Sequence, residues 1–311
     1  MCGLFGFSNY GGEKIRDLAD LTNSLARQSA VRGTDAAGIA LCTLGNIKIC
    51  KEAKPAYDIE FKHPDDVSAV IGHTRHSTQG TEKKNWNNHP FMGRTKNSRF
   101  ALAHNGVIIN DKELRKKYKL PRTKIETDSY IAVQLIESQR KSDLADAIRF
   151  TAEKLDGSFS LSILDDRNNL YLVKGDSPLS ILHFPSMKLY VYASTDEILY
   201  KSLVDFPPLF KALKSCDYEE THIKEGDILK IRPDGVKEKS MFNYSFYCGR
   251  DWWDYGSYYG FGKSEYIDDL KYVAGCQGYS PDDVDELLNA GFTLEEIEDY
   301  IYRVCEKDGE I

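Results

Sequence analysis

A cysteine stands directly after the first methionine, at the start of the stretch MCGLFGF. If Met1 is removed, Cys2 carries a thiol and a free α-amine, and the amine can act as the base for its own thiol. The alternative is an ordinary buried cysteine, the role expected for most of the seven cysteines in the chain. No CxxC pair occurs among them, so their spacing predicts neither a structural zinc site nor a disulfide framework. The rest of the sequence has to decide between the two interpretations of Cys2.

Four further stretches concentrate arginine, histidine, asparagine, aspartate and glycine, which are common in active sites: RGTDAAGI (32–39), GHTRHSTQG (72–80), NNHPF (87–91) and HNG (104–106). Each stretch lies at the end of a predicted strand or in the loop that follows, where binding sites are usually built. Taken singly, each has a structural alternative: an ion pair in a turn, a histidine satisfied in the core, or a tight turn with positive φ.

Other chemistry is poorly supported by the spacing of these residues. The histidines at 73, 76, 89 and 104 include no i, i+4 pair with a carboxylate companion, and no cysteine stands in ligand register with them. No GxSxG stretch presents a serine nucleophile. We therefore expect no metal site and no cofactor.

Composition bounds the class of protein. The 311 residues are 41% hydrophobic, enough for a substantial core, and the net charge of −7 provides no basic field for nucleic acid or an anionic membrane. No basic leader followed by an apolar run begins the chain, and no apolar stretch is long enough to span a bilayer. We expect a cytoplasmic protein whose main ligand is not nucleic acid.

The elements that must position these residues form a layered pattern. A short strand over residues 3–8 precedes a helix within 13–30, and two consecutive helices are expected over 127–138 and 143–155. Strands are expected before and after the helix pair, over 38–44, 68–74, 99–105, 158–165, 170–176, 189–195 and 227–232. This order favours an α+β fold with two sheets between helix layers over a regular βαβ alternation.

The composition changes after about residue 240. We expect a main domain over 1–240, an aromatic and glycine-rich connector over 241–275, and a small helical segment over 276–311. In that segment Ser280 with Pro281 begins one helix, and Thr293 with Glu296 begins another. The segment could dock on its own domain or bind a partner, and the sequence leaves both possibilities open.

In combination, the motifs resemble those of a known family. MCGLFGF, RGTDAAGI, GHTRHSTQG, NNHPF, HNG and ETDS, in this order along residues 1 to about 240, are similar to the signature of class II glutamine amidotransferases. These enzymes belong to the N-terminal nucleophile hydrolases. The resemblance implies a four-layer αββα sandwich that hydrolyses the side-chain amide of glutamine, with the first residue of the mature chain as nucleophile.

The resemblance also implies a role for each matching residue. The nucleophile would be Cys2, and Asn105 with the backbone N–H of Gly106 would form the oxyanion hole. For the substrate, Arg75 would bind the α-carboxylate and Asp128 the α-ammonium. The others are supporting residues: Arg32 near the N-terminus, and Thr78 and His76 on the loop that closes over glutamine. The residue types suit these roles, since a free amino acid needs a fork-like cation and an anion at a fixed separation.

Two positions depart from the family pattern. His76 stands where related synthases usually have Trp or Tyr, and Gln79 stands where the sugar-phosphate synthase has a histidine. Both lie on the expected closing loop, so they bear on how the loop seals and signals to an acceptor site. They leave the hydrolytic step itself unaffected.

Three hypotheses follow from the sequence. The first is a stand-alone glutaminase subunit that delivers ammonia to a separate synthase, because residues after 240 are too few for an acceptor domain. The second is an amidohydrolase of another γ-glutamyl compound. The third is a catalytically silent regulatory protein that binds glutamine.

Overall fold

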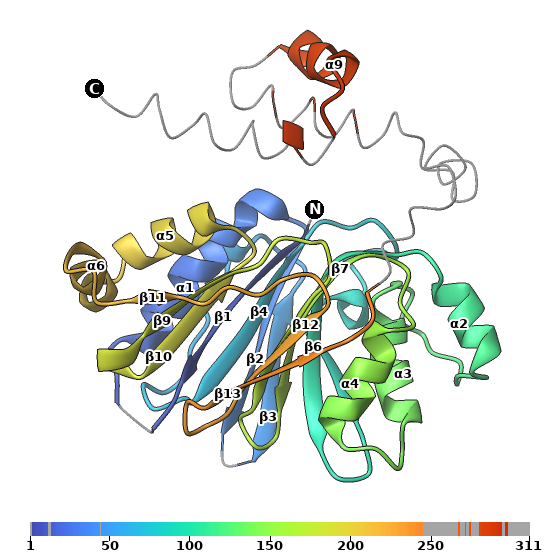
Figure 1. Ribbon diagram of the computed structural model, residues 1–311, viewed down its shortest axis with the longest axis horizontal. Helices are drawn as coiled ribbons and strands as arrows, with labels where there is room; N and C mark the ends of the chain where they lie inside the picture. Colours follow the sequence, from blue (N-terminus) through green and yellow to red (C-terminus); the bar gives the residue numbers. More distant parts are fainter. Residues whose placement is uncertain are drawn as a thin grey trace. The chain divides into compact units, whose positions relative to one another are not determined.

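The chain divides into two compact units, residues 1–246 and 247–311, which are described separately. In the computed structural model, the described residues are 2–11, 14–43, 45–244 and 280–293, with the single positions 267, 271, 274, 296 and 297 (Figure 1). The three-part division expected from the sequence stays a prediction. Its connector, 241–275, lies largely outside the described residues.

The first sheet has seven strands in the order β11-β9-β10-β1-β4-β2-β3, and neighbouring strands are antiparallel. Its strands are β1 (Gly3–Asn9), β2 (Ala36–Thr43), β3 (Asn46–Glu52), β4 (Ala69–Arg75), β9 (Ser180–Phe184), β10 (Leu189–Ala193) and β11 (Glu219–Glu220). Strand β1 is therefore the middle strand of the sheet, between β10 and β4. Cys2 directly precedes this strand.

The second sheet has six strands in the order β13-β12-β8-β7-β6-β5, again antiparallel. Its strands are β5 (Phe91–Arg94), β6 (Arg99–Ile108), β7 (Gly157–Asp165), β8 (Leu170–Lys174), β12 (Asp227–Ile231) and β13 (Lys237–Met241). The long strand β6 pairs along its length with β7, from Phe100 opposite Asp165 to Ile108 opposite Gly157.

Helices cover the outer face of each sheet (Figure 1). Those that pack on the first sheet are α1 (Leu18–Ser29), α5 (Asp196–Val204) and α6 (Pro207–Lys214). Those that pack on the second are α2 (Asp111–Lys117), α3 (Tyr130–Ser138) and α4 (Leu144–Ala152). Short 3₁₀ turns lie at η1 (Ala30–Arg32), η2 (Ala56–Asp58), η3 (Asn85–Asn87) and η4 (Pro185–Met187). The predicted α+β, αββα sandwich is confirmed.

Strand alternation explains why there are three apolar layers. Along β1, Phe5 and Phe7 join the cluster under the helices, whereas Leu4 joins the cluster between the two sheets. Because successive side chains of a strand point to opposite faces, each central strand supplies both layers. Side chains in register with Leu4 therefore point between the sheets.

One glycine is required by this packing. Gly72 of β4 lies opposite Phe5 of β1, and a Cβ at position 72 would come within 2.2 Å of the Phe5 ring. Since Phe5 is fully buried, the ring has little room to move.

We expect Gly72→Ala to lower the free energy of unfolding by about 1–3 kcal/mol, the usual cost of overpacking a core. Urea denaturation of the wild type and the variant measures this difference. An unchanged midpoint with an unchanged slope would show that the sheet accommodates the methyl group.

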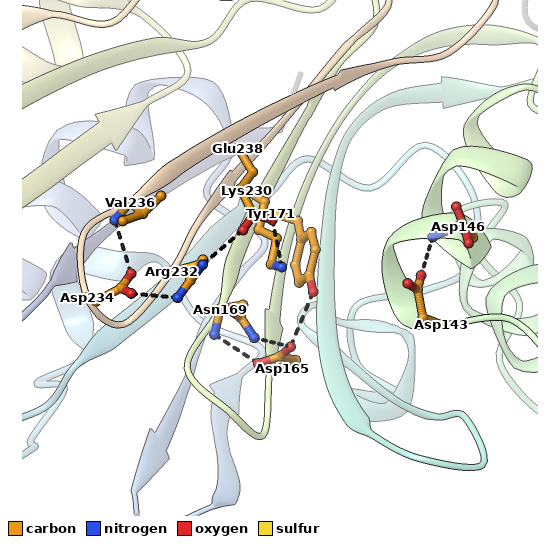
Figure 2. Close-up of polar contacts among 10 residues, drawn as sticks. All are labelled: Asp143, Asp146, Asp165, Asn169, Tyr171, Lys230, Arg232, Asp234, Val236 and Glu238. Carbon is orange, nitrogen blue, oxygen red and sulfur yellow. Dashed lines mark hydrogen bonds and ion pairs between the residues drawn. The ribbon is translucent and has the colours of Figure 1, made fainter.

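Carboxylates fix the two hairpins of the second sheet that Figure 2 draws. At the β7–β8 turn, Asp165 accepts hydrogen bonds from the backbone N–H and the side-chain amide of Asn169, both at 2.8 Å. In the β12–β13 hairpin, Arg232 forms ion pairs with Asp234 at 2.6 Å and Glu238 at 3.3 Å. Asp165 pairs with Phe100, at the opposite end of β6 from Gly106. The β7–β8 turn therefore stabilises the fold at a distance from the predicted oxyanion-binding residue.

In the second unit, α9 (Pro281–Asn289) begins with the predicted cap. The Ser280 hydroxyl accepts from the backbone N–H of Asp282, and the Asp283 carboxylate accepts from that of Ser280. Thr293 and Glu296 form the second predicted cap, with contacts of 2.8 and 3.2 Å. Across the described part of the chain, no helix combines the length and apolar character needed to cross a membrane.

Candidate active site

The register of the strands gathers the predicted residues at one end of the sandwich. Gly3 of β1 pairs with Thr74 of β4, so Cys2 lies beside the end of β4, where Arg75 stands. The sheets meet at this end through the buried His73, whose Nε2–H donates to the backbone oxygen of His104 at 2.9 Å. Asn105 follows His104 on β6, and by alternation it shares the inter-sheet face with Ala101 and Ala103.

Cys2 is held through its backbone. Arg32, at the end of η1, donates from Nε to the Cys2 carbonyl oxygen at 2.8 Å, and the Cys2 thiol lies 3.5 Å from the backbone oxygen of His76. Burial raises the pKa of the Cys2 thiol; the contact with His76 and the positive charge of Arg75 oppose this rise, and the charge of Asp128 adds to it. A buried thiol of raised pKa needs a base before it can act as a nucleophile.

Arg75 is a buried cation, only 3% exposed. Its Nη1 donates to the side-chain oxygen of Asn88 at 2.6 Å, and its Nη2 donates to the backbone oxygens of Gln79 and Gly80 at 2.8 and 2.6 Å. Burial lowers the pKa of Arg75, which nevertheless stays protonated at any physiological pH. Within the described residues these bonds occupy only part of the guanidinium, and the remaining N–H groups can bind a carboxylate.

Asp128 is a buried anion at the same end, 5% exposed. Its Oδ2 accepts from the backbone N–H of Ile108 at 2.7 Å, and its Oδ1 accepts from the Ser129 hydroxyl at 3.3 Å. The charges of Arg75 and Asp128 both act on the Cys2 thiol. The structure therefore brings the predicted cation and anion to the predicted nucleophile.

Asn105 and Gly106 have the properties that an oxyanion-binding pair requires. Asn105 is 2% exposed, and its Nδ2 has no hydrogen-bond partner among the described residues. Gly106 has φ of +130°, and a Cβ there would lie 2.0 Å from the backbone oxygen of Ser158. Only glycine fits this position, and a buried amide without a partner is costly unless a ligand completes it.

The loop 76–80 carries the remaining predicted residues. Asp35 anchors its start, since the Asp35 carboxylate accepts from the backbone N–H of Ser77 at 2.7 Å. His76 is half-buried and Thr78 is exposed. Within the described part of the chain, the Thr78 side chain forms no hydrogen bond with the other predicted residues.

Three histidines lie close together beneath the site. The rings of His73 and His89 are 4.0 Å apart between centroids, and those of His89 and His104 are 6.5 Å apart. Burial holds the pKa values of His73 and His89 well below the usual range, so both rings are neutral at neutral pH. Among the described residues, no group of three or more His, Cys, Asp and Glu side chains could hold a metal ion.

Two functional contacts escaped sequence reasoning. Asn88, which accepts from Arg75, lies in the stretch NNHPF, but the motif does not reveal which of its polar residues faces the arginine. Asp35 lies in RGTDAAGI, where its contact with Ser77 depends on a loop 42 residues away. Both contacts are tertiary and have no periodic signal in the sequence.

The fold is the αββα sandwich expected for an N-terminal nucleophile hydrolase, with Cys2 directly before its central strand β1. Residues 73–201 match the glutamine amidotransferase domain family. Over these residues the chain is therefore similar to glutamine amidotransferases.

Two bacterial aminotransferases are similar to part of this chain. The chain is 34% identical over 189 residues to the glutamine–fructose-6-phosphate aminotransferase of Staphylococcus epidermidis, and 36% identical over 191 residues to that of Staphylococcus aureus. Each match covers 58% of this chain and 30% of the relative, so less than a third of each relative is represented.

The fold is similar to that of the allosteric regulatory enzyme of purine biosynthesis, with a TM-score of 0.62 and 20% identity over 79% of this chain and 50% of that one. It is also similar to that of the glutamine phosphoribosylpyrophosphate amidotransferase from B. subtilis, with a TM-score of 0.61 and 21% identity over the same shares. These two likenesses concern the fold alone.

Proposed function

We propose that this domain hydrolyses glutamine to glutamate and ammonia through a γ-glutamyl thioester on Cys2. The observation that carries the proposal is the buried Nδ2 of Asn105, which has no partner among the described residues and lies at the same end of the sandwich as the Cys2 thiol. A preorganised donor beside a nucleophile is the arrangement that acyl transfer needs.

The two buried charges suit the α-groups of glutamine. Arg75 would bind the α-carboxylate with the N–H groups that its protein bonds leave over, and Asp128 would accept from the α-ammonium. Because both charges are fixed by several hydrogen bonds, they can discriminate a free amino acid from a side chain within a peptide. Thr78 and His76 would lie on the loop that covers the bound substrate, and Arg32 would hold the backbone of Cys2.

The reaction begins once removal of Met1 has freed the Cys2 amine. The amine takes the thiol proton, directly or through a water molecule, and the thiolate attacks the amide carbon of the substrate. An ordinary α-amine has a pKa of about 7.7–8.0, so part of the amine population is neutral at pH 7. The neutral amine can serve as the base that the buried thiol needs. Asn105 Nδ2 and the Gly106 N–H would stabilise the resulting oxyanion.

Collapse of this tetrahedral intermediate breaks the C–N bond of the substrate amide. The leaving nitrogen takes a proton from the protonated α-amine of Cys2 and departs as ammonia. Water then attacks the thioester, with the amine again as base, and glutamate leaves as the thiol is restored. This cycle consumes glutamine and water and produces glutamate and ammonia, with no other reactant.

The ammonia would pass to an acceptor site on another protein, such as a separate synthase subunit. The names of the matching relatives describe transfer to an acceptor, fructose 6-phosphate, and 70% of each relative lies outside the match.

Incubation of the purified protein with glutamine, asparagine or γ-glutamyl amides tests the proposal. The released amino acid, glutamate or aspartate, and the released ammonia are assayed. We expect equimolar glutamate and ammonia from glutamine and little release from asparagine, whose shorter side chain cannot reach Cys2 from the same anchor. Turnover of other γ-glutamyl amides without glutamine turnover would indicate an amidohydrolase of another substrate. Binding of glutamine without turnover would indicate a regulatory protein.

A further inference from the structure

A lysine from the edge of the first sheet points toward the site. Along β3, Ile47 and Ile49 pack against the cluster between the sheets, and Lys51 continues this face at the end of the strand. Lys51 pairs with Gly38 of β2, and a Cβ at Gly38 would lie 2.5 Å from the Lys51 Cβ. The backbone of β3 therefore directs the lysine toward the loop that carries NNHPF.

Lys51 contacts this loop at four residues. Its Nζ donates to the backbone oxygen of Asn88 and, at 3.1 Å, to that of Pro90, and it lies 5.1 Å from the centre of the Phe91 ring. The backbone oxygen of Lys51 accepts from the side-chain amide of Asn85 at 2.8 Å. Lys51 of β3 is therefore bonded to the loop on both sides of Asn88, at Asn85 and at Pro90.

Asn88 passes this constraint to the arginine. Its Oδ1 accepts from Arg75 Nη1 at 2.6 Å, while its Nδ2 donates to the backbone oxygen of Glu82 at 2.9 Å and to the side-chain oxygen of Asn85 at 3.1 Å. With its side-chain orientation fixed by these bonds, any movement of the Asn88 backbone displaces the oxygen that holds Arg75.

We propose that Lys51 is a positioning residue for substrate binding, which acts through Asn88 to hold Arg75 in the orientation that receives the α-carboxylate. This inference rests on the proposed glutamine hydrolysis, and it adds a residue outside the predicted set. Lys51 touches neither the nucleophile nor the reacting atoms, so it should affect KM far more than kcat.

The electrostatic surroundings fit a role that depends on charge. Burial and the positive charge of Arg75 lower the pKa of Lys51 to about 8. The other titratable groups near Lys51 are His73 and His89, both neutral at neutral pH, and Tyr130 of α3, which lines a surface pocket together with Lys51. Among the described residues no carboxylate forms an ion pair with Lys51, so backbone carbonyls are its partners.

The direction of the pH effect follows from this lowered pKa. In the folded protein Lys51 is charged below about pH 8 and neutral above it, and a neutral amine donates weaker hydrogen bonds than an ammonium. We therefore expect KM for glutamine to rise between pH 7 and 9 in the wild type. An arginine at position 51 stays charged across this range, so Lys51→Arg should remove the rise.

Steady-state kinetics of glutamine hydrolysis at pH 7 provide the main test. We expect Lys51→Met to raise KM about fivefold to thirtyfold and to change kcat less than about twofold, since charged hydrogen bonds are lost at a distance from the reacting atoms. Lys51→Arg should restore most of the KM. Lys48→Met is the matched control, because Lys48 is an exposed lysine on the opposite face of the same strand, and its KM should equal that of the wild type.

A double-mutant cycle separates this route from general loosening of the fold. In an Asn88→Ala background the link to Arg75 is already broken, so Lys51→Met should raise KM little further. An unchanged KM in Lys51→Met, a loss confined to kcat, or a full KM effect in the Asn88→Ala background would overturn the inference while glutamine hydrolysis by the wild type stands. Failure of the wild type to hydrolyse glutamine would overturn the proposed function and this inference together.

Discussion

Replacement of Cys2 by alanine is expected to lower kcat for glutamine hydrolysis at least about a thousandfold, because the proposed acyl-enzyme forms on the Cys2 thiol. Binding should survive, since Arg75 and Asp128 are held by hydrogen bonds to Asn88, Gln79, Gly80 and Ile108, none of which involves the thiol. Isothermal titration calorimetry with glutamine should therefore still detect a complex. The inactive variant would then also provide the substrate-bound form of the enzyme.

The matched control for this variant is Cys50→Ala. Cys50 is an exposed free cysteine on β3, on the face of the strand opposite to Ile49 and Lys51, so its loss should leave kcat and KM unchanged. Hydrolysis by Cys2→Ala at a rate near that of the wild type would exclude Cys2 as the nucleophile. It would leave the fold assignment intact and would require another mechanism.

Replacement of Asn105 by alanine is expected to lower kcat about a hundredfold to a thousandfold, the loss seen when one donor to a developing oxyanion is removed. The buried Nδ2 has no other partner among the described residues, so the change removes a donor without breaking a protein hydrogen bond. The free energy of unfolding should consequently fall little or even rise. Kinetics and urea denaturation on the same preparation check both expectations.

Asn105→Asp makes this prediction sharper, because it preserves the size of the side chain but replaces the donor by a negative charge. It should be at least as inactive as Asn105→Ala. Asn46→Ala, which removes an exposed amide at the start of β3, is the control and should retain full activity. If kcat of Asn105→Ala were within about threefold of the wild type, the oxyanion site would have to lie elsewhere.

The αββα fold was predictable because its central strands have a clear pattern in the sequence. GLFGFS, SAVIGHT and RFALAHN are short runs bounded by polar turns, and they became β1, β4 and β6, the strands that position Cys2, Arg75 and Asn105. The strand β3 was missed, since alternating lysines separate its isoleucines and leave no apolar run. The short helices α2, α5 and α6 were missed as well; helices of this length gain most of their stability from packing on a sheet.

The site was predictable at the level of residue types and only partly at the level of contacts. The resemblance of the motifs to the family signature implied that Cys2, Arg75, Asn105, Gly106 and Asp128 act in one site. The contacts that orient Arg75 join β3, the NNHPF loop and the loop after β4, and no local pattern encodes such tertiary contacts. Lys51 illustrates this limit, since in the sequence it is one lysine among many.

The two departures from the family pattern, His76 and Gln79, both contact the site through backbone atoms. His76 and Gln79 each supply a backbone carbonyl oxygen to the site, the first beside the Cys2 thiol and the second to Arg75. A backbone carbonyl is available from any residue, so these contacts tolerate a change of side chain. The substitutions therefore leave intact the bonds that hold the nucleophile and the cation.

Intact-mass spectrometry of the protein, quenched in acid during turnover of glutamine, tests the central claim most directly. We expect a chain that begins at Cys2 and a transient mass increase equal to a γ-glutamyl group, located by peptide mapping on the peptide that contains Cys2. The increase should disappear when glutamine is exhausted and should be absent from Cys2→Ala. Active protein that retains Met1, or an acyl group on any other residue, would rule out Cys2 as the N-terminal nucleophile.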